Sequence, residues 1–124
     1  MAAVDSSSLI ALFEDDPGPD LEILQPALIA GDVVLPPVVL AEVLSDPNLP
    51  DRHRTTLLAL PLLDILPDYW QRAAATRAII LERGLRARLA DTLIAQSCID
   101  HDVALIARDR DFRHFAKHCG LKLA

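Results

Sequence analysis

Four acidic residues spread along the chain occupy positions where carboxylates could act together: Asp5, Glu42, Asp91 and Asp109. Asp5 ends the short apolar run 2–4, and Asp109 closely follows another apolar segment. Glu42 has only apolar neighbours, an arrangement that is costly unless the charge is paired or bound to a cation. Carboxylates brought within a few ångströms repel one another unless cations lie between them. Such a cluster would favour Mg²⁺ or Mn²⁺, which prefer oxygen ligands.

Each of these carboxylates also has a simpler interpretation. Asp5 or Asp91 could cap the start of a helix, and Glu42 could face solvent. Asp109 and Asp111 alternate with arginines, a pattern in which surface ion pairs are the usual outcome. What favours a shared site is the joint placement of the acids, so the hypothesis depends on the fold.

Short apolar runs alternate with longer helical patterns along the sequence. The expected strands are 2–4, 32–35, 62–66 and 103–107, and an edge strand at 121–123 is also allowed. The expected helices are 6–13, 20–30, 38–44, 51–60, 68–83, 92–101 and 112–118. This alternation favours an α/β fold, a central parallel sheet flanked by helices on both faces. With 124 residues, we expect a single domain spanning 1–124.

Capping and helix-breaking residues predict where these helices begin and end. Ser6 or Ser7 is expected to cap the first helix, and Pro26 to kink or interrupt the second. Asp68 and Asp91 are expected to cap the helices that follow them. In an open α/β sheet, ligands bind outside the carboxyl ends of the strands, where the strand order reverses. The acids that follow strands are therefore expected to lie at one edge of the sheet.

Charge is divided unevenly along the chain, whose net charge is −6. Residues 1–51 hold ten acids and no Lys or Arg, whereas residues 52–124 hold all twelve basic residues against eight acids. Arg108, Arg110 and Arg113 stand beside Asp109. Two interpretations stay open, namely solvated helix faces or a basic rim beside an acidic pocket.

The compartment can also be predicted from the sequence. Cys98 and Cys119 are too few for a disulfide scaffold and lack the spacing of a zinc site. The first sixteen residues contain no Lys or Arg, unlike a secretory signal. No apolar run approaches the roughly 20 residues that span a bilayer. We therefore expect a cytoplasmic protein with reduced thiols and no membrane partner.

Four segments of the sequence together resemble a PIN domain: Val4–Ile10, Leu40–Leu44, Ala90–Ala95 and Leu105–Phe112. They occur in the family's order and spacing and span nearly the whole chain. The similarity is greatest to the VapC toxins of bacterial and archaeal toxin–antitoxin pairs. One departure is Ala107, where many relatives carry Thr, and the missing hydroxyl could loosen the site.

The resemblance implies a metal-dependent endoribonuclease that binds Mg²⁺ or Mn²⁺. It assigns the metal-ligating and catalytic acids to Asp5, Glu42, Asp91 and Asp109, with Asp111 sharing or exchanging the role of Asp109. Ser7 would orient the Asp5 carboxylate through a hydrogen bond. Hydrolysis is expected to leave 5′-phosphate and 3′-hydroxyl ends. Arg108, Arg110 and Arg113 could hold the phosphates of the RNA substrate.

Partners follow from the same resemblance, because VapC-like proteins usually form homodimers and are silenced by a VapB-like antitoxin. The main alternative is a PIN-like module that binds RNA or protein and has lost catalysis. A phosphatase of the haloacid dehalogenase type is disfavoured, because it needs an acid where Ser7 stands. A receiver-like phosphoacceptor is disfavoured because the sequence lacks the set of residues it needs. That set is an early acidic pair, a phosphorylatable Asp at the end of a strand in mid-chain, and a late Lys.

Overall fold

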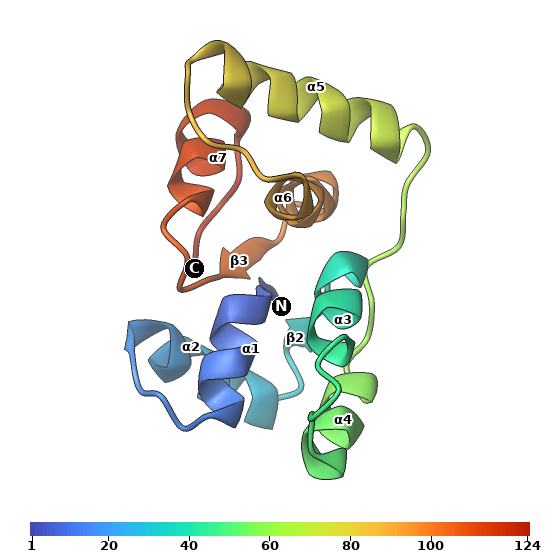
Figure 1. The fold of residues 1–124 in the computed structure, drawn as a ribbon, viewed down its shortest axis with the longest axis vertical. Coiled ribbons are helices and arrows are strands. Elements are labelled where there is room, and N and C mark those ends of the chain that lie inside the picture. The colour runs from blue at the N-terminus through green and yellow to red at the C-terminus, as the bar shows by residue number, and fades with distance from the viewer.

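The computed structural model describes residues 1–124, and a small parallel sheet lies at its centre (Figure 1). The strands are β1 (Ala2–Val4), β2 (Val33–Val34) and β3 (Ala104–Ile106). They are ordered β2-β1-β3, and β1 pairs in parallel with both neighbours. Their residues are apolar without alternation, as expected for a sheet covered on both faces. The predicted α/β class is confirmed.

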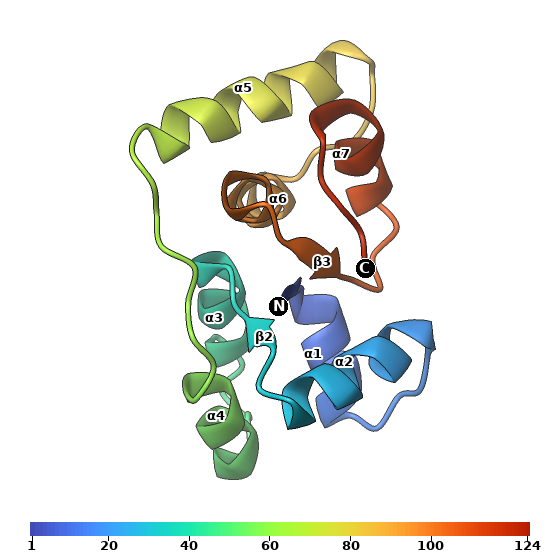
Figure 2. The ribbon, with the colours of Figure 1, turned by 180° about the vertical axis from the view of Figure 1, so that it is seen from behind.

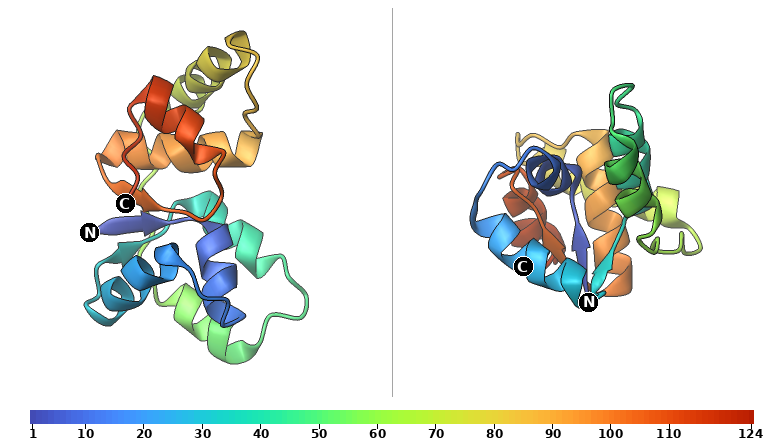
Figure 3. Two further views of the ribbon diagram at one scale, coloured as in Figure 1. Left: turned by 90° about the vertical axis from the view of Figure 1, so that its left-hand side faces the viewer. Right: turned by 90° about the horizontal axis from the view of Figure 1, so that it is seen from below.

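Seven helices surround this sheet: α1 (Ser6–Phe13), α2 (Pro19–Ile29), α3 (Pro37–Leu44), α4 (Asp51–Leu58), α5 (Tyr69–Glu82), α6 (Leu89–His101) and α7 (Phe112–Cys119). The chain moves from β1 to β2 in one direction and from β2 to β3 in the other. Right-handed crossovers therefore place the intervening helices on opposite faces. The view from below shows α1 and α2 on one side of the strands and α3 and α6 on the other (Figure 3).

Helices α5, α6 and α7 pack on one another, and Figures 1 and 2 show them as a group above β3. The core that joins these layers is mostly aliphatic. Ala3, Val4, Leu105 and Ile106 supply its centre from the strands, each at most 1% exposed. No helix has both the length and the apolar character needed to cross a membrane.

Two expected strands are reduced to single bridges. In the segment 62–66, only Leu62 pairs, with Leu35, and in 121–123 only Leu123 pairs, with Leu105. The segment 62–66 has no longer strand to pair with, because β2 ends at Val34 and the prolines that follow β2 begin α3. The prediction of a strand at 62–66 was therefore wrong, whereas the edge strand allowed at 121–123 is present only as a bridge beside β3.

Helix boundaries also differ from the expectations. Asp5, not Ser6 or Ser7, caps α1, and its carboxylate accepts a hydrogen bond from the Ser7 backbone N–H. Helix α2 runs through Pro26 without interruption. A proline at an exposed position near the end of a helix removes only one backbone hydrogen bond, so the helix persists here. Asp68 precedes α5 as expected, but it is in the left-handed conformation and its side chain makes no capping bond.

Helix α6 begins earlier than predicted, at Leu89, and Arg88 occupies the capping position. Asp91 therefore lies inside the first turn and is not the cap. The carboxylate of Asp91 is consequently not engaged by the backbone at the start of the helix.

Candidate metal site

The site lies at the carboxyl ends of two adjacent strands. Asp5 directly follows β1, and its backbone N–H donates to the carbonyl oxygen of Ile106 at 2.9 Å. Asp109 lies in the loop between β3 and α7. Because β1 and β3 are neighbours, the residues that follow them emerge side by side. This is the point where the strand order reverses, as in other open α/β sheets.

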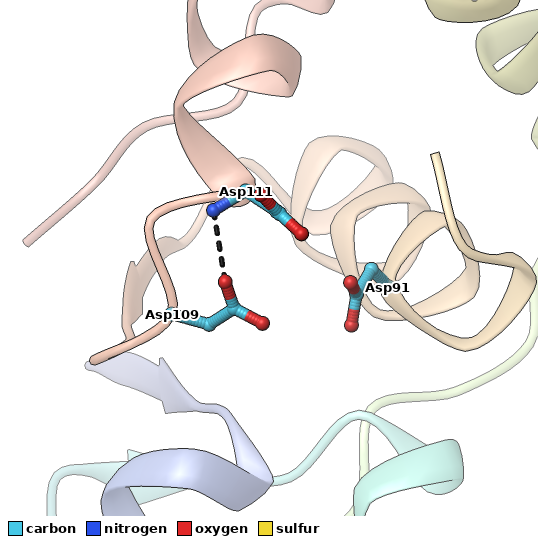
Figure 4. Close-up of side chains that lie close together, drawn as sticks. All are labelled: Asp91, Asp109 and Asp111. Atoms are coloured by element: carbon cyan, nitrogen blue, oxygen red, sulfur yellow. Dashed lines mark hydrogen bonds between the residues drawn. The ribbon is translucent and has the colours of Figure 1, made fainter. Parts of the chain in front are cut away.

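Three carboxylates face one another at this edge: Asp91 from α6, Asp109 from the loop and Asp111 at the start of α7 (Figure 4). One carboxylate oxygen from each lies within 4.8 Å of the others. Asp111 donates its backbone N–H to Asp109 Oδ1 at 2.9 Å, which fixes the turn between the two residues. All three side chains are half-buried, so these charges are partly removed from water.

Asp5 and Glu42 lie beside this group of three without belonging to it. Asp5 is buried, with 3% of its surface exposed, whereas Glu42 on α3 is exposed. The hydroxyl of Ser6 joins the two acids, since its Oγ lies 3.0 Å from Glu42 Oε1 and 3.4 Å from Asp5 Oδ1. The structure thus brings the four predicted acids to one region, together with Asp111.

Burial and mutual repulsion perturb the ionisation of these acids. Burial raises the pKa of Asp91 from 3.8 to about 6, with further contributions from the negative charges of Asp109, Asp5 and Glu42. Burial likewise raises the pKa of Asp5, to which the charge of Asp109 adds. Although Glu42 is exposed, its carboxylate is partly shielded from water, and this shielding together with the charge of Asp5 raises its pKa, while the hydrogen bond from Ser6 opposes the shift. The cluster therefore holds more negative charge than the protein alone neutralises.

Ser7 connects the two strands across the site. Its Oγ donates a 2.6 Å hydrogen bond to Asp5 Oδ2. The same oxygen accepts from the backbone N–H groups of Arg108, at 3.2 Å, and Asp109, at 3.4 Å. One hydroxyl thus contacts both the acid after β1 and the loop after β3.

The three arginines near Asp109 differ in their surroundings. Arg110 and Arg113 are exposed. The guanidinium of Arg108 instead contacts Asp16 in the loop between α1 and α2 and Asp20 in the first turn of α2. This engagement favours a structural role for Arg108 over the RNA-binding role expected from the sequence.

The ion pairs expected from the alternating Arg and Asp residues at 108–111 are not formed within this segment. Neither Asp109 nor Asp111 makes an ion pair, and Arg108 pairs with acids elsewhere in the chain. The simpler interpretation of these two acids, as partners of the neighbouring arginines, was therefore wrong.

The donor set fits a hard divalent cation. Asp91 Oδ2 is buried and has no hydrogen-bond partner, a costly condition for a carboxylate oxygen. No Lys or Arg forms an ion pair with any of the five acids. Oxygen ligands gathered without a protein cation are what Mg²⁺ and Mn²⁺ select. A bound cation would reduce the repulsion among the carboxylates and would give Asp91 Oδ2 a partner.

A groove adjoins Glu42 between α1, α3 and α4. Its volume is about 440 Å³, and Ile10, Phe13, Leu49 and His53 contribute to its lining. The rings of Phe13 and His53 stack with their centroids 4.2 Å apart. Glu42 thus borders both the acidic cluster and a partly apolar surface.

Sequence reasoning missed three residues that shape this region. Ser6 links two of the acids, and its place in a run of three serines after a strand was the available signal. Asp16 and Asp20 bind Arg108 from about ninety residues away in the sequence. Nothing local in the sequence could have indicated that pairing.

Solved structures of other proteins share the fold of this chain. No curated protein sequence matches the chain. Among solved structures, one match is VapBC2 from Rickettsia felis, bound to a DNA fragment from the promoter, with a TM-score of 0.76 and 17% identity over 99% of this chain and 96% of the other. Another is VapBC-5 from Mycobacterium tuberculosis, of the VapBC family of toxin–antitoxin systems. It has a TM-score of 0.67 and 22% identity over 98% of this chain and 95% of the other.

These likenesses show a shared fold. The family model of the PIN domain matches residues 2–118, which include all of the acids described above. On this match, the chain belongs to the PIN domain family.

Proposed function

We propose that this protein is a metal-dependent endoribonuclease and the toxin of a VapBC-type toxin–antitoxin pair. The observation that carries the proposal is the meeting of the Asp91, Asp109 and Asp111 carboxylates, one of which, Asp91, has a buried oxygen without a hydrogen-bond partner. Membership of the PIN domain family and the similarity of the fold to VapBC structures support it.

The proposed ligands of Mg²⁺ or Mn²⁺ are Asp5, Glu42, Asp91 and Asp109, with Asp111 as a further ligand. Asp109 Oδ1 already accepts the N–H of Asp111, so its Oδ2 is the oxygen left for a cation. Ser7 would orient Asp5, and Ser6 would hold Glu42 and Asp5 at a fixed separation. Hydroxyl groups that orient ligating carboxylates typically change metal affinity 10- to 100-fold when they are lost.

A bound divalent cation acidifies water and stabilises the charge that develops on a phosphodiester during hydrolysis. The protein's own part is to present ionised oxygens, and Asp91 is the group that limits this. With a pKa of about 6, its carboxyl holds a proton in mildly acidic solution. Arg110 and Arg113, which are exposed and close in sequence to Asp109 and Asp111, would bind phosphates of the RNA.

The experiment that tests this proposal is a map of new 5′-phosphate RNA ends in cells that express the wild type or Asp91→Asn. The matched control is Asp32→Asn, which makes the same change at an exposed position just before β2. Asp32 lies at the amino-terminal ends of the strands, opposite to the site. We expect discrete new ends with the wild type and Asp32→Asn, and none with Asp91→Asn. Purified protein should then cleave the mapped RNA in Mn²⁺ and lose activity in EDTA.

Two results would contradict the proposal. If Asp91→Asn cleaves RNA as the wild type does, the assignment of the metal site is wrong. If no protein produces new ends although all are folded, the alternative of a PIN-like module that binds RNA or protein without catalysis is favoured.

We also propose a VapB-like antitoxin and a homodimer as the protein's assemblies. The groove beside Glu42 supports the antitoxin, because a segment of the antitoxin bound there would border the acidic cluster.

Exposed apolar side chains such as Trp70, at 62%, and Leu89, at 57%, support the homodimer. Light scattering on the purified chain should give twice the mass of one copy, and a monomer at micromolar concentration would contradict the dimer.

A further inference from the structure

Arg108 is adjacent to Asp109 in the sequence, yet its side chain points away from the acidic cluster. Its guanidinium reaches the loop between α1 and α2 and the first turn of α2. Its Nε lies 3.1 Å from Asp20 Oδ2 and its Nη2 lies 3.0 Å from Asp20 Oδ1. Its Nη1 lies 2.8 Å from Asp16 Oδ2, and its Nη2 also donates to the backbone oxygen of Asp16 at 2.7 Å. All three guanidinium nitrogens are therefore engaged.

Asp20 is held in place to receive this side chain. Its side chain is 6% exposed, and Ser8 on α1 donates a hydrogen bond of 2.8 Å to Asp20 Oδ2. Gly18 lets the guanidinium approach closely, since a Cβ at this position would lie 2.7 Å from Arg108 Nη2 and 2.8 Å from Asp20 Oδ1. The α1–α2 segment is thus shaped around the arginine, which separates this ion pair from an ordinary exposed one.

The backbone of the same residue is attached to a second point. The N–H groups of Arg108 and Asp109 both donate to Ser7 Oγ, which in turn donates to Asp5 Oδ2. The loop after β3 is therefore anchored by a side chain on one side and by the backbone on the other. Asp109 lies directly after these anchors, and Asp111 is tied to Asp109 through its own N–H.

We infer that Arg108 and Asp20 form a positioning pair that holds the loop after β3, so that Asp109 and Asp111 face Asp91 in a geometry that binds a divalent cation. The inference rests on the proposed function, because it concerns the metal site proposed above. Arg108 acts here through the placement of its neighbours and not by contact with substrate.

Charge and geometry make opposite predictions for Arg108, which is what makes the inference testable. Removing a positive charge near an acidic cluster strengthens cation binding if only electrostatics matters. Releasing the loop weakens cation binding if Arg108 positions the ligands, and changes around ligating groups typically cost 10- to 100-fold in affinity. The sign of the change therefore separates the two effects.

The experiment measures Mn²⁺ affinity by calorimetry for the wild type, Arg108→Gln, Arg108→Lys and Asp20→Asn. Arg113→Gln is the matched control, because it removes an equal charge from an exposed arginine nearby. All measurements are made at a temperature where circular dichroism shows each variant folded. Amide exchange of Arg108, Asp109 and Asp111 is followed in parallel without metal.

We expect Arg108→Gln and Asp20→Asn to bind Mn²⁺ roughly tenfold more weakly, with faster exchange of the three amides. A double variant that combines Arg108→Gln with Asp20→Asn should bind Mn²⁺ no more weakly than either single variant, because both changes remove one shared interaction. Arg108→Lys keeps the charge and part of the hydrogen bonding, so its affinity should be intermediate. It also remains informative if Arg108→Gln fails to fold.

Other results overturn the inference. If Arg108→Gln and Arg108→Lys melt at lower temperature but bind Mn²⁺ as tightly as the wild type or more tightly, the pair stabilises the fold without positioning the ligands. Asp5→Asn distinguishes a failure of the proposed function. If the wild type and Asp5→Asn bind Mn²⁺ equally, the metal site itself is wrong, and the positioning role falls with it.

Discussion

Ser7 Oγ donates a 2.6 Å hydrogen bond to Asp5 Oδ2, so the acid that ends β1 is held by the helix that it caps. The same hydroxyl is the acceptor for two backbone N–H groups about a hundred residues later. A single side chain thus couples the two strands whose ends carry the candidate site.

Replacing Ser7 with Ala should therefore affect both stability and metal binding. The change removes a donor from a buried carboxylate and an acceptor from two N–H groups, which typically costs about 1–3 kcal/mol. Urea unfolding measures the loss. Ser45→Ala is the control, since its hydroxyl bonds only to the Ala41 carbonyl oxygen on an exposed surface. If the two variants lose equal stability, the bridging role of Ser7 is wrong.

The raised pKa of Asp91 predicts how the stability of the metal-free protein varies with pH. Its pKa rises from 3.8 to about 6 on folding, so the folded state holds the proton more tightly than the unfolded state. The contribution of Asp91 to the free energy of unfolding is therefore fully present below about pH 4 and is lost as the pH rises through 6. Because Asp91 is only half-buried, we expect a loss on the order of 1 kcal/mol from this group after solvent screening.

Asp91→Asn tests this pH dependence directly. The variant should lose that part of the decline between pH 4 and 6 and should be more stable than the wild type at pH 7 without metal. Mn²⁺ should raise the melting temperature of the wild type more at pH 7 than at pH 5, because binding competes with the proton. Identical pH profiles for the variant and the wild type would contradict the assigned shift.

Gly18→Ala tests how tightly the Arg108 guanidinium fits. The φ of Gly18 is 177°, an extended conformation that alanine also adopts, so the expected penalty is steric. The new Cβ would meet Arg108 Nη2 at 2.7 Å and must displace it. We expect a loss of about 1 kcal/mol together with faster exchange of the Asp109 amide.

Gly31→Ala provides the comparison for that variant. Gly31 has a φ of +72° and open space around it, so alanine there strains the backbone without touching Arg108. A similar loss of stability is expected, but with unchanged exchange at Asp109. Equal exchange in the two alanine variants would show that Gly18 does not act through Arg108.

Arg110 and Arg113 should contribute to RNA binding through charge alone. Changing both to Gln should weaken RNA binding and reduce its dependence on salt, with the slope of log K against log [salt] falling by roughly 1 to 2. Mn²⁺ affinity should not fall. Filter binding at several salt concentrations measures the slope. Lys122→Gln is the control, because Lys122 forms an ion pair with Asp102. Asp102 precedes β3 and so lies at the amino-terminal end of that strand, opposite to the site.

Local patterns in the sequence were sufficient for much of the fold. The apolar runs 2–4 and 103–107 predicted buried parallel strands, and the acids after them predicted the end of the sheet at which a site is expected. The alternation of these runs with helical patterns predicted the α/β class. These features depend on periodicity and composition within a few residues, which the sequence contains directly.

Other features depend on contacts between distant residues, and only the tertiary structure decided them. The segment 62–66 is apolar enough for a strand, but it forms only a bridge because β2 is too short to pair with it. Asp91 fits a capping position by residue type, yet α6 begins two residues before it. The residues next to Arg108 in the sequence do not determine whether its side chain contacts RNA or another part of the protein. Its ion pair with Asp20 arises because the packing of α1 and α2 on the sheet places a carboxylate within reach, and no local pattern encodes that distance.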